Sequence, residues 1–454
     1  MKLYTKNTGS NYLAQIVVLP KPEKHLNADK LQVVRIQGSQ IIVGMNAKEG
    51  DTCILFPLEC AINKKLLAFT NSFSDPLRNA DGKTKGFFND KGRVRAVKLR
   101  GTPSEGYLCP VESFQAWVDS LAGFPDIGLN LEAGKEFDSM EYLFADGAKN
   151  TVVKEELICE KYVPFQQAAK GPANQIKLDK TRRFDKMIPG QFHFHVDTAQ
   201  LKKNIDLINQ EDTITITEKL HGTSAVFSRI LVKRKLSFLE KVAKFIGCKV
   251  QETEYDVVYS SRAVIKNAYL YAENQKLNHW YKQDVWGDAK LKIQDCIESG
   301  ISIYAEIVGQ MKNGGWIQKG YDYGTKPCEF DIYVYRITST NPKGSVIEFS
   351  TNQIKSYCQK YDLKMVPIHY HGPAYGLVSE VKKTFHEDLL DYLTKEYLEK
   401  PCGMCKNNVP AEGIVVTVEK DQFTAYKLKS WAFFEGETKA LDAGEVDIEQ
   451  QETK

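Results

Sequence analysis

One run of alternating residues constrains the fold of the second half of this chain more than any other feature. Thr213 to Thr217 alternates threonine with isoleucine, and this period of two predicts a β-strand with one buried face. The strand runs directly into Glu218 to Ser224, of sequence EKLHGTS, and apolar residues resume from Ala225 to Ile230. A glycine in such a turn lets the backbone pass close to a ligand. The pattern therefore predicts two strands joined by a tight turn, with Lys219 at its mouth.

Lys219 allows two interpretations. The side chain of lysine has a pKa of about 10.4 in model peptides, so an ordinary lysine is protonated at neutral pH and is not a nucleophile. Neighbouring cations or a metal ion would lower its pKa and activate the amine. A solvated lysine before a turn is the plainer interpretation. The charged residues farther along the chain favour the first.

Four later segments predict strands that carry charged residues. They are Ile303 to Gly309 with Glu306, Glu329 to Tyr335 with Asp331, Ala411 to Val416 with Glu412, and Ala425 to Lys429 with Lys427 and Lys429. The last two lysines stand two residues apart, so they point to the same face of a strand. Paired like charges on a buried face are costly unless an anion lies between them, which indicates a nucleotide phosphate.

The first hundred residues have a different pattern, of short apolar segments separated by turn residues. Five segments predict strands: Ala14 to Val18, Leu31 to Ile36, Ile41 to Gly44, Thr52 to Phe56 and Val94 to Leu99. Five strands of this length fit a small β-barrel of the OB type, a common nucleic-acid-binding module. A barrel used only for packing is the alternative.

Four cations lie on the last of these strands and beside it, namely Arg93, Arg95, Lys98 and Arg100. On an exposed face they could follow a phosphate backbone. The alternative is an edge strand whose charges resist aggregation. Their local density favours the phosphate contact. Because the formal net charge of the chain is only +3, any nucleic-acid surface must be a local patch.

The length of 454 residues exceeds one ordinary core. We expect an α+β protein with an OB-type domain at 1–130, a connecting segment at 131–210, a second sheet domain at 211–436 and a flexible acidic tail at 437–454. Helices are expected at Val111 to Ala122 and at Thr198 to Ile208.

Composition excludes several classes of protein. Hydrophobic residues at 42% and charged residues at 26% are typical of a folded chain, which excludes a disordered scaffold. No stretch approaches the roughly 18 apolar residues of a membrane helix, and Met1 to Ser10 lacks a signal-peptide core, so we expect no membrane partner. The ten scattered cysteines indicate a reducing, cytoplasmic setting.

Taken in order, the charged segments resemble the motifs of the covalent nucleotidyltransferases, the superfamily of polynucleotide ligases and capping enzymes. The segments are KLHG from Lys219 (similar to motif I), SR ending at Arg262 (motif Ia), YAE ending at Glu306 (motif III), FD from Phe330 (motif IIIa), EGIV from Glu412 (motif IV) and KLK from Lys427 (motif V). Each motif is short, but their order along the chain is specific.

The residue two places after the lysine separates branches of this superfamily. DNA ligases and capping enzymes typically carry Asp there, whereas RNA ligases similar to the second T4 type carry Glu-Lys-x-His-Gly-Thr. His221 matches the RNA ligase form, while Ser224 departs from the Asn often found next. VKLRG at 97–101 and SEG at 104–106 are similar to the branch with an amino-terminal OB domain. The chain thus resembles ATP-dependent RNA ligases, with an ATP-grasp-like domain of antiparallel sheets and flanking helices.

The resemblance implies a three-step reaction. Lys219 would attack the α-phosphate of ATP and form lysyl-AMP, the AMP would pass to a 5′-phosphate, and a 3′-hydroxyl would displace it. Lys427 and Lys429 would grip the α-phosphate. Glu412 would hold the water shell of a divalent cation, Mg²⁺ or Mn²⁺, with Glu306 as a possible second carboxylate.

The resemblance also implies an ATP-binding set. It consists of Glu218, His221, Gly222, Arg262, Glu306 and Phe330. Phe330 would stack on adenine, Glu306 would bind ribose or a metal-bound water, and Arg262 would contact ribose or the nucleic-acid end. The plainer alternatives are a core phenylalanine at Phe330 and a turn histidine at His221.

Two further features allow structural interpretations. Cys402 and Cys405 form half of a zinc site, but His369 and His371 lack the spacing of a zinc finger, so a reduced loop is favoured. An insertion from Leu231 to Glu254 has apolar residues at helical spacing beside lysines. It is either a basic helix that touches RNA or an amphipathic helix that covers the sheet.

The leading hypothesis is a monomeric ATP-dependent RNA ligase that seals 3′-OH/5′-phosphate nicks in an RNA duplex or an RNA/DNA hybrid. A DNA ligase or a capping enzyme is the enzymatic alternative, but His221 and the position of the OB segment before the catalytic motifs argue against both. An inactive OB-type nucleic-acid-binding protein is the alternative of another class. Lys219 and Glu412 argue against it, since a decayed site would lose such residues.

Overall fold

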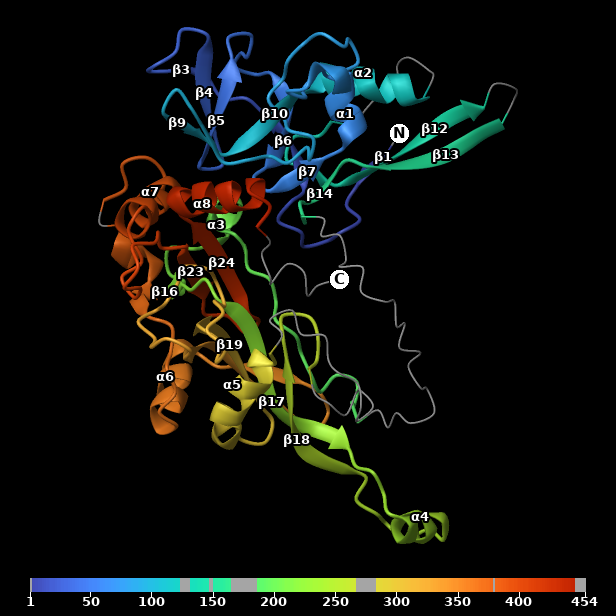
Figure 1. Ribbon diagram of the computed structural model, residues 1–454, viewed down its shortest axis with the longest axis vertical. Helices are drawn as coiled ribbons and strands as arrows, with labels where there is room; N and C mark the ends of the chain where they lie inside the picture. The colour runs from blue at the N-terminus through green and yellow to red at the C-terminus, as the bar shows by residue number, and fades with distance from the viewer. Residues whose placement is uncertain are drawn as a thin grey trace. The chain divides into compact units, whose positions relative to one another are not determined.

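The computed structural model describes residues 2–122, 131–146, 150–164, 186–266, 283–378 and 380–445. The chain divides into two compact units. The first unit comprises Met1–Pro164 and Phe434–Gly444, and the second comprises Phe165–Phe433 and Glu445–Lys454. Figure 1 shows the elements of both units.

The first unit is built from short antiparallel strands. Its largest sheet has the order β10-β6-β2-β11, formed by β2 (Ala14–Val18), β6 (Thr52–Pro57), β10 (Gly106–Pro110) and β11 (Glu136–Phe137). The smaller sheets are β3-β4-β5 (Glu23–Lys24, Leu31–Ile36, Ser39–Gly44), β8-β9 (Val97–Leu99, Thr102–Ser104), β14-β7 (Cys159–Lys161, Cys60–Ile62) and β1-β12-β13 (Lys2–Tyr4, Ser139–Asp146, Asn150–Leu157). The described strands of this unit thus form five separate sheets and no closed barrel, so the expected OB barrel is not confirmed.

The helices of the first unit are α1 (Lys64–Phe69), η1 (Pro76–Arg78) and α2 (Val111–Ala122). Phe114 and Trp117 of α2 are buried in the core beside Phe56 and Phe137. Burial of such side chains contributes roughly 2 kcal/mol each relative to exposure. The predicted bounds of β2, β4 and α2 are confirmed.

Two expected boundaries differ from the structure. The first unit continues past residue 130, because β1 pairs with β12 and β7 pairs with β14. The expected tail from 437 is wrong in its first part, since α8 extends over Trp431–Asp442. Leu441 is only 4% exposed, so the helix is held by packing rather than frayed. Residues 446–454 lie outside the described residues.

The second unit contains two five-stranded sheets (Figure 1). The sheet named here the lysine sheet has the order β15-β24-β23-β16-β22, from Ala199–Gln200, Thr424–Lys429, Gly413–Val418, Thr213–Lys219 and Ile368–Pro373. The sheet named the glutamate sheet has the order β18-β17-β19-β20-β21, from Thr253–Ser260, Thr223–Lys233, Ile301–Gly309, Phe330–Thr340 and Val346–Glu348. All pairs are antiparallel except β15 with β24.

The second unit also contains helices. They are α3 (Leu201–Asn204), η2 (Ile205–Leu207), α4 (Phe238–Phe245), α5 (Val285–Ile293), η4 (Gln294–Cys296), α6 (Thr351–Lys360), η5 (Ala374–Leu377), α7 (Phe385–Tyr397) and the start of α8. None of the described helices is long and apolar enough to cross a membrane.

The alternation of isoleucine and threonine along β16 explains which face of the lysine sheet is buried and which lines the cavity. Ile214 and Ile216 are fully buried against Leu389 and Leu393 of α7. Thr215 therefore faces the opposite side, where it lines a cavity. The same strand thus supplies one face to the core and the other to the candidate site.

Candidate active site

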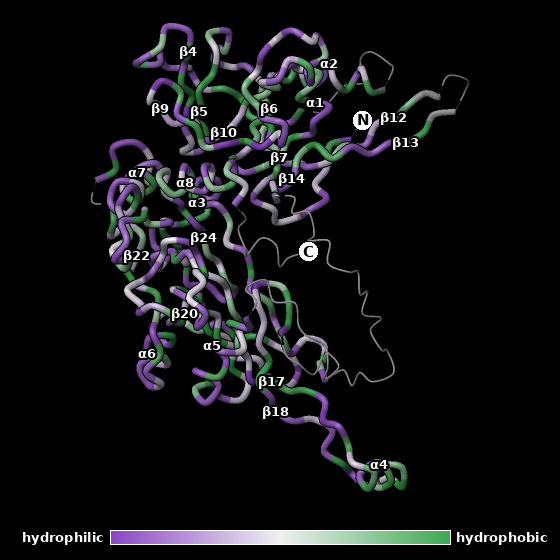
Figure 2. Tube along the Cα trace, in the orientation of Figure 1, coloured by the Kyte–Doolittle hydropathy of each residue, from purple (hydrophilic) through white to green (hydrophobic). Residues whose placement is uncertain are grey.

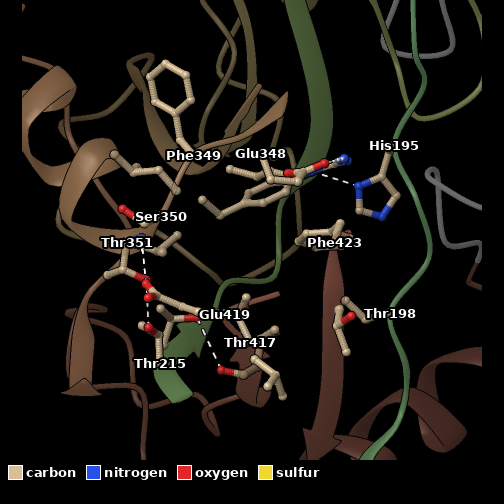
Figure 3. Close-up of a pocket in the computed structure, with 18 of the residues that line it drawn as sticks. His195, Thr198, Thr215, Glu348, Phe349, Ser350, Thr351, Thr417, Glu419 and Phe423 are labelled. Atoms are coloured by element: carbon tan, nitrogen blue, oxygen red, sulfur yellow. Dashed lines mark hydrogen bonds and ion pairs between the residues drawn. The ribbon is translucent and has the colours of Figure 1, made fainter. Parts of the chain in front are cut away.

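A cavity of about 490 Å³ lies in the second unit and is lined from both sheets. The lysine sheet contributes Thr215, Lys219 and Lys427, and the glutamate sheet contributes Ser224 and Glu306. Figure 3 shows one part of its wall, where Thr215 and Thr351 share a hydrogen bond of 2.6 Å between their hydroxyl groups. Its size suits a small ligand with a few polar groups.

Two lysines, of which Lys219 lines this cavity, converge on one carboxylate. The amine of Lys219 lies 2.9 Å from Oε1 of Glu412, and that of Lys429 lies 3.3 Å from the same oxygen. The register explains this convergence, because Lys219 pairs with Gly413, which pairs with Lys429 across the next strand. Glu412 directly precedes that glycine. The sheet therefore brings together residues that are far apart in the sequence.

Glu412 is a buried anion held by cations. Its side chain is only 3% exposed, and burial alone would raise the pKa of its carboxyl group. The charges of Lys219 and Lys429 outweigh burial and lower the pKa of Glu412 to about 2. Oε2 has no hydrogen-bond partner among the described residues, although Nδ1 of His221 lies 3.8 Å from it.

Lys427 lines the same cavity, two residues before Lys429. Burial lowers the pKa of Lys427 to about 8, and repulsion from Lys429 and Lys219 adds to this effect. The amines of Lys219, Lys427 and Lys429 thus form a cluster close enough for mutual repulsion. Such a site attracts an anion such as a phosphate.

An arginine also lines the cavity, beside an acid that the sequence analysis did not identify. Arg262 forms an ion pair with Asp197, and both residues line the cavity. Asp197 also lies 3.6 Å from Nε2 of His195. Burial raises the pKa of Asp197, but Arg262 overcomes this and the net shift is downward. No short motif marks Asp197, since only the folded chain brings it to Arg262.

Glu306 holds the turn after Lys219. Its carboxylate accepts hydrogen bonds from the backbone N–H of Gly222 at 3.0 Å and from the hydroxyl of Ser224 at 3.3 Å. A Cβ at Gly222 would lie 2.3 Å from the carbonyl oxygen of Ile307, so only glycine fits there. Gln318 donates to the Gly222 carbonyl at 3.0 Å. The turn is fixed before any ligand binds.

His221 is enclosed by aromatic residues. Its backbone N–H donates to the hydroxyl of Tyr323 at 2.5 Å. Its ring lies edge-on to the rings of Tyr321 and Phe433, with both centroids 4.9 Å away. The tyrosines were not identified from the sequence, because they lie outside every motif.

The structure does not bring Phe330 to the cavity. Its ring is 2% exposed and packs in the core of the glutamate sheet, so the expected stacking on adenine is not supported. Tyr335, on the opposite face of the same strand, does line the cavity. Glu218 also lines it and lies 2.7 Å from Nε2 of His369.

The expected phosphate-binding cations of the first unit are mostly paired. Arg93 is 1% exposed and lies 2.9 Å from Asp442, so its expected contact with a phosphate backbone is wrong. Arg95 lies 3.3 Å from the same acid, and Lys98 lies 3.2 Å from Glu435. Arg100 is exposed at the turn between β8 and β9.

Cys402 and Cys405 are free thiols near this site. His371 instead contacts Thr215 at 2.9 Å, and His369 contacts Glu218. Among the described residues, no group of three or more His, Cys, Asp or Glu side chains could hold a metal ion directly. The interpretation as a reduced loop stays a prediction.

The sequence of the second unit matches a known family, and the whole fold matches solved structures. Residues 212–431 match the model of the family described as RNA ligase. A Naegleria gruberi RNA ligase variant with AMP and Mn is 15% identical, with a TM-score of 0.53 over 93% of this chain and 98% of that chain. Another variant with ATP and Mn gives the same values.

The same ligase with PPi is 16% identical, with a TM-score of 0.51 over 94% of this chain and 99% of that chain. At this identity the likeness establishes the fold alone. This chain therefore has the sheet-rich α+β fold of an RNA ligase, and its residues 212–431 match the RNA ligase family.

Proposed function

We propose that this chain is an ATP-dependent RNA ligase that seals 3′-OH/5′-phosphate nicks through a lysyl-AMP intermediate. The observation that carries the proposal is the convergence of Lys219 and Lys429 on one oxygen of Glu412, at 2.9 and 3.3 Å, beside a cavity that Lys427 lines. The match of residues 212–431 to the RNA ligase family supports it.

Lys219 is the proposed nucleophile. Its nitrogen attacks the α-phosphorus of ATP, the P–N bond forms, and the bond to pyrophosphate breaks as the amine proton passes to solvent. Glu412 orients the amine but is too weak a base to keep that proton, since its pKa is about 2.

Lys427 and Lys429 are the proposed phosphate-binding residues. They lie on one face of β24, two residues apart, and their charges stabilise the negative charge that develops on the α-phosphate. Arg262 is the proposed contact to ribose or to the 5′-phosphate end, and its ion pair with Asp197 fixes its position. Glu218 is the proposed contact to the adenine; it lines the cavity and lies 2.7 Å from Nε2 of His369.

Glu412 and Glu306 are the proposed carboxylates for a divalent cation, Mg²⁺ or Mn²⁺. Oε2 of Glu412 is buried and has no hydrogen-bond partner among the described residues, which fits a hydrated cation nearby. Mg²⁺ usually keeps several waters and binds through one or two carboxylates and substrate phosphates, so a cluster of three ligands is not required. Such a cation supplies stabilisation of phosphoryl charge.

The structural neighbours support the choice of ATP and a divalent cation. The Naegleria gruberi ligase has been solved with ATP and Mn, with AMP and Mn and with PPi. These are the nucleotide, its adenylate and the leaving group of the proposed first step. The proposal carries them over to this chain because it shares the fold.

The finer assignments follow the motifs. His221 in place of Asp favours an RNA ligase similar to the second T4 type over a DNA ligase or a capping enzyme. The first unit is the proposed contact to the duplex around the nick, through exposed cations such as Arg100 rather than through Arg93.

A set of nicked duplexes tests the proposal. The strands on each side of the nick are RNA or DNA in all four combinations, the 5′-phosphate is labelled, and products are separated under denaturing conditions. We expect ATP-dependent sealing when the 3′-hydroxyl strand is RNA, and none by Lys219→Ala. Sealing of the all-DNA nick at the rate of the RNA nick would overturn the assignment to RNA.

A further inference from the structure

The helix at the tip of the β17–β18 hairpin presents an apolar face to solvent. Figures 1 and 2 show α4 projecting from the sheet at the end of this hairpin, with hydrophobic residues along it. Five large apolar side chains are between 43% and 91% exposed: Phe238, Leu239, Val242, Phe245 and Ile246. The sequence-based alternative that this helix covers the sheet is therefore wrong.

These five residues share one side of the helix. At about 100° per residue they span an arc of roughly 120°, the width of an amphipathic stripe. Glu240, Lys241 and Lys244 occupy the remaining side. The helix needs no contact with the sheet to begin correctly, since Ser237 and Glu240 form a capping box.

The segment around the apolar face is strongly basic. Residues 233–249 contain six basic side chains and one acidic side chain, a net charge of +5, whereas the whole chain carries +3. The basic residues are Lys233, Arg234, Lys235, Lys241, Lys244 and Lys249. Arg234 pairs with Glu240, and Lys244 pairs with Glu252 just beyond this segment.

We propose that α4 is an interfacial anchor that binds an anionic lipid surface. The apolar face enters the boundary between headgroups and acyl chains, and the lysines contact the anionic headgroups. Aliphatic side chains such as Leu239 and Ile246 gain nothing from a phosphate backbone, which disfavours RNA as the occupant. Because α4 lies at the tip of a hairpin, a flat surface can contact all five of its exposed apolar residues at once.

This inference revises the sequence-based expectation of no membrane partner. That expectation rested on the lack of a spanning segment, but an interfacial helix needs only an apolar face and a basic border. The proposal does not depend on the ligase activity, because α4 shares no residue with the cavity lining.

Flotation of the full chain with lipid vesicles tests the proposal. One vesicle is phosphatidylcholine alone, and the other contains about one third phosphatidylglycerol. We expect the protein to float with the anionic vesicles about tenfold more than with neutral ones, and to be released at about 0.5 M NaCl. Failure to float with anionic vesicles would overturn the proposal.

Two variants locate the contact. Phe238→Ser combined with Phe245→Ser removes the two most exposed aromatic residues of α4 and should lower vesicle binding about tenfold or more. Leu291→Ser is the matched control, since Leu291 is 63% exposed on α5, and it should bind like the wild type. Wild-type binding by the double variant would also overturn the proposal. The proposal would be overturned as well if the wild type did not bind vesicles and the double variant lost affinity for RNA or lost self-association.

Discussion

The amine of Lys219 lies 2.9 Å from Oε1 of Glu412, a buried carboxylate at the start of the neighbouring strand. The pair is created by the register of β16 against β23, in which Lys219 stands opposite Gly413. The carboxylate also receives Lys429, so one anion holds two amines in place. The positions of both amines in the proposed site thus depend on Glu412.

Replacing Glu412 by Gln should abolish most of the adenylylation of Lys219. The change keeps the size of the side chain but removes the charge that holds the two amines, and it weakens any cation site. We expect the rate of protein adenylylation to fall about 100-fold or more. Glu329→Gln, at an exposed position, is the matched control. A rate for Glu412→Gln within about threefold of the wild type would contradict this role.

The low pKa of Lys427 predicts a pH dependence of nucleotide binding. Burial and the neighbouring lysines lower the pKa of this amine to about 8, so it becomes neutral in the free protein above that pH. Anion binding needs the charged form, and affinity for AMP should therefore fall as the pH rises above 8, by up to about tenfold per unit. Titration calorimetry from pH 7 to about 10 measures this.

Lys427→Arg provides the control for that dependence. Arginine keeps its charge throughout this range, so the fall in affinity above pH 8 should disappear or shrink. An equal fall in both proteins would assign the pH dependence to another group.

Gly222→Ala should disrupt the turn that follows Lys219. The added Cβ would meet the Ile307 carbonyl oxygen at 2.3 Å and the Glu306 side chain at 2.9 Å. Overpacking of this kind costs about 1–3 kcal/mol, and it separates Glu306 from Gly222. We expect a lower Tm in calorimetry together with a loss of adenylylation. Gly403→Ala, which meets no atom within 4 Å, should change neither.

Arg93→Ala should destabilise the first unit rather than weaken nucleic-acid binding. The guanidinium of Arg93 is buried and pairs with Asp442, so its loss leaves a partly buried carboxylate without that partner. We expect about 2–4 kcal/mol of lost stability, seen as a lower Tm. The folded variant should bind nicked RNA with unchanged Kd, whereas Arg100→Ala should weaken binding and leave Tm unchanged. The reverse result would restore Arg93 to the nucleic-acid surface.

The sequence predicted several local elements well. Period-two runs identified β16 and β24, and the helical spacing after Leu231 indicated α4. The motif order indicated that Lys219 and Glu412 belong to one site, and the structure places them in contact.

The errors come from contacts between distant parts of the chain. Phe330 alternates with Asp331 along β20, but the pattern did not say which face meets the core. Arg93 looked like a surface cation because its partner lies 349 residues away at Asp442. Asp197 carries no local signal at all, since only tertiary structure brings it to Arg262.

The most direct test of the account is the intact mass of the protein after incubation with ATP and Mn²⁺, followed by peptide mapping. The account predicts a covalent adduct of one AMP on Lys219, absent from Lys219→Ala and removed by pyrophosphate. Lys429→Ala should form it slowly, which separates the nucleophile from the residue that shares its carboxylate. No adduct on protein first stripped with pyrophosphate, or an adduct on another lysine, would contradict the account.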